Sequence, residues 1–182
     1  MQMTKTDIPG CFLLEPSVHG DERGFFLESW NQRVFDDLGI DARFVQDNHS
    51  RSASGVLRGI HYQLGTPQGK LVRVTRGSVF DVAVDLRRNS ETFGRWVGVE
   101  LSEENRRMFW VPEGFGHGFL VTSGTADFQY KCTAYYDPQN DRAIRWDDPD
   151  LAIDWPLVGD APPELSRRDA SAPLLKDAEV FK

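Results

Sequence analysis

Hydrophobic and polar residues alternate along the middle of the chain, from about Ser50 to Thr133. The clearest alternation lies in residues 80–86, where Phe80, Val82, Val84 and Leu86 share one face and Asp81, Ala83 and Asp85 share the other. The pattern recurs at 97–101 and 128–132, and segments typical of turns separate these runs, at Gly65–Gly69, Arg88–Ser90 and Pro112–Gly118. A period of two residues is typical of half-buried antiparallel strands, and several short strands at this spacing predict an all-β fold, either a β-sandwich or a jelly roll.

One short helix is predicted after the first strands. Ser29 can cap its first turn while Gln32 reaches back toward the cap. An apolar stripe over residues 34–38 follows, and it stops at Gly39, a residue type that commonly ends helices.

The chain changes character from Trp146 onward, where it is rich in Pro, Asp and Ala and has no regular period. Because Ile153, Trp155 and Leu157 would be costly to leave in water, we expect an ordered tail lying over the barrel. Residues 1–182 are then predicted to form one domain, with N-terminal strands and a helix at 1–48, a core barrel at 49–145 and the C-terminal tail at 146–182.

Composition limits the classes of partner. The 182 residues, 40% hydrophobic and 27% charged, suit one soluble domain, and the net charge of −7 argues against nucleic acid as the main partner. Cys11 and Cys132 show no metal-binding spacing and are expected to be free thiols in a reducing cytosol. No apolar run is long enough for a signal peptide or a membrane span, so a cytoplasmic protein is expected.

His61, in the segment LRGIHYQ, is the first candidate for chemistry. A histidine titrates near neutral pH and can take a proton from carbon, and Arg58 before it and Lys70 after it suit a substrate with phosphate charge and a developing oxyanion. Arg58 and His61 would face opposite sides of a regular strand unless Gly59 marks a bulge. A lone histidine in a strand is more often structural, so this pattern alone leaves both readings open.

Each of three further residues could have either a functional or a purely structural role. Lys70 follows the turn LGTPQG and is either an inward, working lysine or an exposed strand end. His117 lies among three glycines, in a segment that either approaches a ligand closely or forms a tight turn. Tyr130 shares its face with Phe128 and Cys132, so it points inward, either as a general acid or as ordinary aromatic packing.

Asp169 lies in the segment SRRDASAP, which by itself is typical of a loop with solvated carboxylates. Only a tail that folds back could bring it to His61, where it would orient the imidazole and raise its basicity.

A catalytic metal is not expected. Many small β-barrels bind metals through an HxH pair, but here Tyr62 and Gln63 follow His61. The chain holds four histidines, His19, His49, His61 and His117, and three histidine ligands would need distant partners.

Taken together, the chain resembles the dTDP-4-dehydrorhamnose 3,5-epimerases, a metal-free branch of the cupin-type jelly rolls. The similarity covers nearly the whole chain and is carried by DERGFFLESW (21–30), FVQDNHSRS (44–52), VLRGIHYQ (56–63), GKLVRVTRGSVFDVAVDLR (69–87), FGRWVGVELS (93–102), VPEGFGHGF (111–119), FQYKCTAYYDP (128–138), IRWDDPDLAIDWP (144–156) and LSRRDA (165–170).

The resemblance implies a set of site residues. His61 would be the general base, oriented by Asp169, Tyr130 the general acid, and Lys70 a cation near the enolate oxygen. The implied substrate-binding residues are Arg23, Glu28, Gln46, Asp47, Asn48, Arg58, His117, Asp141 and Arg168. Asp141 stands where relatives often carry Glu, and Arg168 where they often carry Lys, so each keeps its charge with a different reach or shape.

The resemblance also implies the reaction and the partners. The substrate would be dTDP-4-dehydro-6-deoxy-D-glucose, inverted at carbons 3 and 5 to dTDP-4-dehydro-L-rhamnose without a cofactor or a metal. A homodimer with an exchanged N-terminal strand is expected, in which Arg23 and Glu28 could complete the partner's site. Three alternatives stay open: an epimerase acting only at carbon 3 or only at carbon 5, a carbohydrate-binding jelly roll without catalysis, and a metal-dependent cupin.

Overall fold

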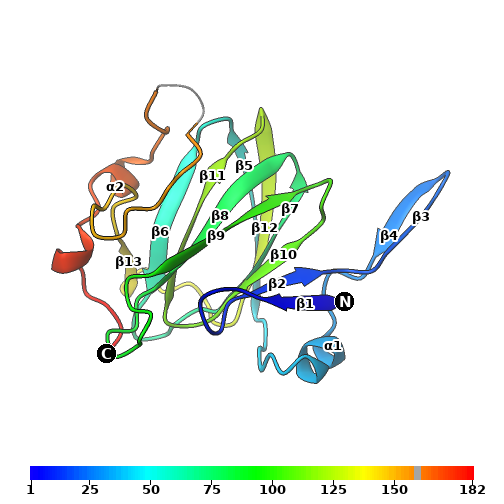
Figure 1. Ribbon diagram of the computed structural model, residues 1–182, viewed down its shortest axis with the longest axis horizontal. Coiled ribbons are helices and arrows are strands. Elements are labelled where there is room, and N and C mark those ends of the chain that lie inside the picture. The colour runs from blue at the N-terminus through cyan, green and yellow to red at the C-terminus, as the bar shows by residue number, and fades with distance from the viewer. Residues whose placement is uncertain (158–160) are drawn as a thin grey trace.

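Two antiparallel sheets face each other and form the body of the molecule (Figure 1). The computed structural model describes residues 1–157 and 161–182. The six-stranded sheet runs in the order β1 (Gln2–Lys5), β2 (Phe12–Glu15), β10 (Met108–Val111), β7 (Lys70–Arg76), β12 (Thr125–Cys132) and β5 (Gln46–Ala53). The five-stranded sheet runs in the order β13 (Asp141–Ala143), β6 (Leu57–Gln63), β11 (Phe115–Val121), β8 (Ser78–Asp85) and β9 (Trp96–Ser102). The predicted all-β sandwich is confirmed.

The remaining elements lie outside these two sheets. The hairpin of β3 (Val18–Asp21) and β4 (Gly24–Leu27) projects away from the barrel (Figure 1). The helical elements are short: α1 (Gln32–Asp37), α2 (Arg167–Ala170) and a 3₁₀ turn at Leu175–Asp177. In the described residues, no helix combines the length and the apolar character needed to cross a membrane.

The interior between the sheets is a closely packed apolar core. It includes Val72 and Phe128 from one sheet and Ala83 and Phe119 from the other. The loop between β1 and β2 adds Ile8 and Cys11. Cys11 and Cys132 are both buried free thiols, as predicted, and burial raises the pKa of each thiol.

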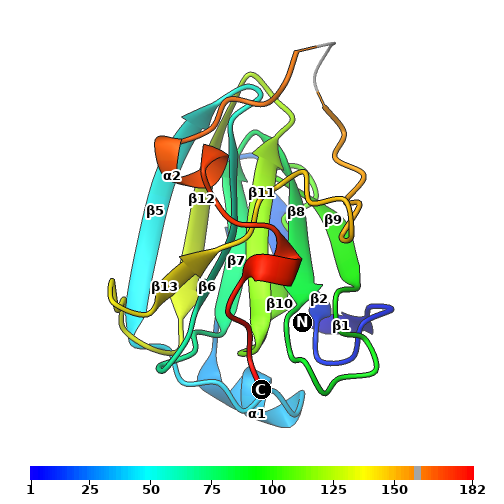
Figure 2. The ribbon, with the colours of Figure 1, turned by 90° about the vertical axis from the view of Figure 1, so that its left-hand side faces the viewer.

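Strand β8 is buried on both faces, so the prediction of half-buried strands is wrong for it. Its Asp81–Ala83–Asp85 row points into the barrel, and its Val82–Val84–Leu86 row packs against the C-terminal tail. Figure 2 shows this tail, with α2, running across the outer side of the five-stranded sheet. The predicted ordered tail is therefore confirmed, and Trp155 is buried within it. Leu157, by contrast, remains 40% exposed.

Two local predictions need correction. Helix α1 begins at Gln32, and its cap is Asn31, whose side chain accepts a hydrogen bond from the backbone N–H of Arg33; Ser29 does not cap it. The proposed turn at Pro112–Gly118 is too long, since β11 already begins at Phe115. The glycines there serve strand packing: a Cβ on Gly118 would lie 2.8 Å from the carbonyl oxygen of Arg58.

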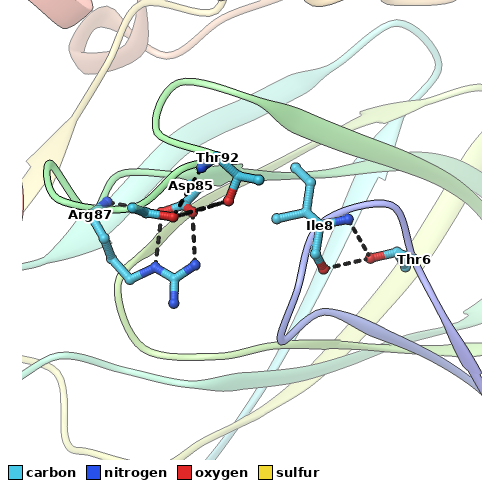
Figure 3. A network of polar contacts seen from close by, with 6 residues as sticks. Thr6, Ile8, Asp85, Arg87 and Thr92 are labelled. Atoms are coloured by element: carbon cyan, nitrogen blue, oxygen red, sulfur yellow. Dashed lines mark hydrogen bonds and ion pairs between the residues drawn. The ribbon is translucent and has the colours of Figure 1, made fainter.

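A buried polar cluster closes the turn between β8 and β9 (Figure 3). The Asp85 carboxylate accepts hydrogen bonds from Nε of Arg87 at 2.9 Å, from its Nη2 at 2.7 Å and from the Thr92 hydroxyl at 2.6 Å. The same view includes the N-terminal loop, where the Thr6 hydroxyl donates to the carbonyl of Ile8 at 3.0 Å. Asp85 therefore tethers the end of β8, four residues beyond Asp81 on the same inward row.

Candidate active site

A bulge in β6 turns Arg58 and His61 to the same side of the strand. His117 pairs with His61 and Phe119 pairs with Arg58, so two steps along β11 match three along β6. Gly59 lies in this bulge with φ +135°, and a Cβ there would lie 2.5 Å from the Cα of Gly118. Only glycine fits this close approach, which confirms that Gly59 marks a bulge. The side chain of Arg58 then reaches the facing sheet, where its Nε donates to the Ser52 hydroxyl at 3.1 Å.

His61 and Asp169 form a close pair although they are far apart in the sequence. Nε2 of His61 lies 2.5 Å from Oδ1 of Asp169, and the carboxylate is 2% exposed whereas the imidazole is 29% exposed. The tail therefore folds back as the pairing requires. Because Nε2 faces a carboxylate, the neutral imidazole carries its proton there and leaves Nδ1 free to accept another.

Helix α2 holds Asp169 in place. Ser166 caps the helix, and its hydroxyl accepts the backbone N–H of Asp169 at 3.0 Å. Burial by itself raises the pKa of Asp169, but the hydrogen bond and the charge of His61 outweigh it, so the pKa lies below its ordinary value. Asp169 is therefore an anion at neutral pH.

Lys70 is the cation of the site. It begins β7, beside Cys132 on β12. Burial lowers the pKa of Lys70, while the charges of Asp81 and Asp141 act in the opposite direction. Lys70 shares its face of β7 with the core residues Val72 and Val74, so it points inward rather than forming an exposed strand end.

Tyr130 is a half-buried phenol on the six-stranded sheet. Its ring packs 6.0 Å from that of Phe128, between centroids, at the edge of the core. Burial raises the pKa of Tyr130, and the charge of Arg58 partly offsets this effect. The phenol therefore keeps its proton at neutral pH and can donate it.

Asp81 lies beside the predicted site residue His117, although no local pattern in the sequence singles it out. It is fully buried, and both of its carboxylate oxygens lie 3.0 Å from Nε2 of His117. Burial raises the pKa of Asp81, and its neighbours His117 and Lys70 lower it by less. The alternation of residues 80–86 placed Asp81 on one face with Ala83, but only the pairing of β8 with β11 brings it to His117.

Other predicted residues form a polar rim at the ends of β5, β12 and β13. Nη1 of Arg168 lies 2.7 Å from Oδ2 of Asp141, so these two predicted binding residues pair with each other. On β5, the Gln46 amide donates to Asn48 at 3.1 Å, and the Asn48 amide lies 3.6 Å from the sulfur of Cys132. Asp47, between them, points to the opposite face and pairs with Lys131 at 2.9 Å.

Arg23 and Glu28 lie apart from this group in the single chain. Arg23 sits at the tip of the projecting hairpin and pairs with Asp21. Glu28 follows the hairpin and accepts a hydrogen bond from the Asn31 side chain at 3.0 Å. Figure 1 shows the hairpin directed away from the barrel, so the fold of one chain does not bring these residues to His61.

The chemistry available follows from these groups. A free imidazole nitrogen, an ammonium group and a protonated phenol project from facing sheets, which suits proton transfer at a carbon next to a carbonyl group. Within residues 1–157 and 161–182, no three His, Cys, Asp or Glu side chains gather as metal ligands would.

Comparisons with known proteins agree over the full length. The profile of the family described as dTDP-4-dehydrorhamnose 3,5-epimerase matches residues 5–177. The chain is 57% identical over 182 residues to the dTDP-4-dehydrorhamnose 3,5-epimerase of Pseudomonas aeruginosa, covering 100% of this chain and 99% of the relative. It is 56% identical over 180 residues to the enzyme of that name from Salmonella typhimurium, covering 98% of this chain and 97% of the relative.

A solved structure also resembles this chain, over nearly its full length. The dTDP-6-deoxy-D-glucose-3,5-epimerase of Legionella pneumophila, crystallised in complex with dTDP-4-keto-L-rhamnose, superimposes with a TM-score of 0.95 at 55% identity. The match covers 98% of this chain and 94% of that one. With the profile match and the two relatives, this similarity shows that the chain belongs to the dTDP-4-dehydrorhamnose 3,5-epimerase family.

Proposed function

We propose that this protein inverts carbons 3 and 5 of dTDP-4-dehydro-6-deoxy-D-glucose to give dTDP-4-dehydro-L-rhamnose, by proton transfer to His61 and from Tyr130 through an enolate. The protein is an epimerase of dTDP-L-rhamnose biosynthesis, as its full-length relatives are. The observation that carries the mechanism is the 2.5 Å contact between His61 and the buried Asp169.

His61 removes the proton. The 4-keto group acidifies the C–H bonds on both neighbouring carbons, so one base can serve both. Nδ1 of His61 accepts the proton, the C–H electron pair becomes the new C=C bond, and the C=O pair moves onto oxygen. Asp169 stabilises the imidazolium ion, since its carboxylate lies on the other ring nitrogen.

Lys70 and Tyr130 complete the reaction. The ammonium group of Lys70 stabilises the enolate oxygen, a kind of contact typically worth about 3–4 kcal/mol in the transition state. Tyr130 extends from the six-stranded sheet and His61 from the five-stranded sheet. A sugar held between the sheets is therefore approached from opposite sides, and a proton returned by Tyr130 inverts the carbon. Water then resets both groups, with no net redox change.

The rim residues bind the nucleotide part of the substrate in this proposal. Arg58 and Arg168 supply positive charge suited to the diphosphate. Gln46 and Asn48 offer polar contacts on the rim, while Asp47 is placed to contribute through its backbone, because its side chain faces outward. His117 is buried beside Asp81 and offers its polar contact from inside the barrel.

A homodimer explains the position of the hairpin. Phe25 and Phe26 on β4 are 58% and 70% exposed, which is unusual for large apolar side chains on one hairpin. We propose that the hairpin inserts into a second copy, bringing Arg23 and Glu28 to the partner's site. Gel filtration that shows a monomer at micromolar concentration would contradict this.

Exchange with heavy water tests the catalytic proposal. The protein is incubated with the substrate in heavy water, and deuterium at carbons 3 and 5 is counted by NMR. We expect label at both carbons, and loss of label in the His61→Asn variant with retained dTDP binding. His49→Asn is the control, because His49 is an exposed histidine on the outward face of β5.

Two outcomes would change the conclusion. Label at one carbon only would identify a single-site epimerase. Unchanged exchange in His61→Asn would remove the base assignment.

A further inference from the structure

Asp148 is a buried carboxylate that the proposed mechanism does not use. Its side chain is 1% exposed, and all its hydrogen bonds in the described structure come from backbone N–H groups. Oδ1 accepts from Asp150 and Leu151 at 2.9 Å each, and Oδ2 accepts from Leu175 at 2.7 Å. A buried charge is costly unless it is well hydrogen-bonded, so these three charge-assisted bonds hold Asp148 and its donors together.

These bonds join two parts of the tail that flank α2. Residues 148–151 follow the last strand of the barrel, and Leu175 lies six residues after Asp169. Beside this contact, the backbone N–H of Arg145 donates to the carbonyl of Pro173 at 2.9 Å. On the other side of α2, Glu164 pairs with the segment that leads into β6, through backbone hydrogen bonds with Gly55 and Leu57. Hydrogen bonds therefore fix the segment that contains Asp169 on both sides of α2. On the C-terminal side, the side chain of Asp148 supplies one of these bonds.

Helix α2, which lies between these hydrogen bonds, is too short to be stable without them. α2 contains only four residues, far fewer than an isolated helix needs to be stable in water. The contact that it must keep is short, since Asp169 lies 2.5 Å from His61. A small displacement of the segment would lengthen this bond, and a misplacement of about 1 Å can cost about 100-fold in rate.

We propose that Asp148 is a positioning residue for the reaction: it fixes the tail so that Asp169 stays in hydrogen-bond contact with His61. The inference rests on the proposed function, because it needs the His61–Asp169 pair to be the base. Asp148 itself touches neither the substrate nor His61; it acts through the backbone of the tail.

The test compares Asp148→Asn with Asp147→Asn. The two aspartates are adjacent, but Asp147 is exposed and pairs with Arg145 on the surface, so its variant is the matched control. We expect kcat for deuterium exchange to fall about 10- to 100-fold in Asp148→Asn, the range usual when a partner that orients an active group is lost. Asp147→Asn should stay within about twofold of the wild type.

A double-mutant cycle separates positioning from general weakening. If Asp148 acts only through Asp169, adding Asp148→Asn to the Asp169→Asn variant should cause no further decrease in kcat. The NMR signal of the His61 Nε2 proton, held by Asp169, should weaken in Asp148→Asn and remain in Asp147→Asn. Full activity in a folded Asp148→Asn protein, or a loss of equal size in both backgrounds, would overturn the proposal.

A second variant covers the case in which Asp148→Asn does not fold. Leu175→Pro removes the N–H that donates to Oδ2 together with the buried Leu175 side chain, so Leu175→Ala, which loses the side chain and keeps the N–H, is its matched control. Proline suits this position, because Leu175 is the first residue of the 3₁₀ turn and Leu174 before it is extended, with φ −72° and ψ 158°. It should lower kcat in the same way, and unchanged kcat would refute the inference. If Asp169→Asn itself leaves exchange intact, the proposed mechanism fails instead.

Discussion

Replacing Asp85 with asparagine should destabilise the protein at neutral pH and have little effect near pH 2. Burial alone raises the pKa of Asp85, but the hydrogen bonds from Arg87, Ser90 and Thr92 outweigh it and hold the pKa at about 2, against an ordinary 3.8. At about 1.4 kcal/mol per pH unit, the difference between 3.8 and about 2 amounts to about 2.5 kcal/mol of stability.

The direction of the pH effect follows from the two states. The folded protein binds the Asp85 proton more weakly than the unfolded chain, so the stabilisation is complete above about pH 4. It is lost as the pH falls through about 2, where Asp85 becomes protonated in the folded state as well. Asparagine resembles the protonated acid in shape and charge. The variant should therefore lose about 2.5 kcal/mol at pH 7 and almost nothing at the acidic limit.

Urea unfolding from pH 7 to pH 2, followed by the fluorescence of the five tryptophans, measures this difference. Asp21→Asn is the matched control. Asp21 accepts the backbone N–H and the guanidinium of Arg23 in the same i, i+2 arrangement, but its side chain is 50% exposed whereas that of Asp85 is fully buried. We expect no measurable loss in the control. A difference in unfolding free energy between wild type and Asp85→Asn that stays constant with pH would contradict this role of Asp85, as would an equal loss of stability in Asp21→Asn.

Two further predictions concern the site itself. Burial lowers the pKa of Lys70, although the charges of Asp81 and Asp141 oppose this shift. As the pH rises, the ammonium group should therefore lose its proton, and kcat/KM should begin to decline, at a pH below 10.5, the ordinary pKa of lysine. Lys70→Met should lower kcat about 100- to 1,000-fold and abolish this alkaline decline, and a variant that kept the decline would exclude Lys70 as its source. Gly118→Ala should destabilise the protein by about 1–3 kcal/mol and reduce activity, because its Cβ would meet the backbone of the bulge 2.8 Å away. Gly124→Ala, with nothing within 4 Å of its Cβ, is the control; equal melting temperatures of the two variants would contradict the packing argument.

Much of the architecture follows from local sequence. Alternation over residues 80–86 and the glycine-containing turns predict strands, because the period of a strand depends only on neighbouring residues. The end of α1 just before Gly39, the free cysteines and the inward direction of Tyr130 follow from equally local signals. Sequence segments between residues 21 and 170 that resemble those of the epimerases indicated the family, which the comparisons confirm.

Local sequence therefore specifies strands such as residues 80–86 and the residue types available for chemistry, whereas the packing of the whole chain determines which of these residues meet. His61 and Asp169 are separated by 108 positions, and no local pattern shows that the tail returns to β6. Asp81 meets His117, and both faces of β8 are buried, only because β11 and the tail pack against that strand. Alternation reports which residues share a face, whereas the partner of that face depends on pairing between distant segments, and this pairing is set by the packing of the whole chain.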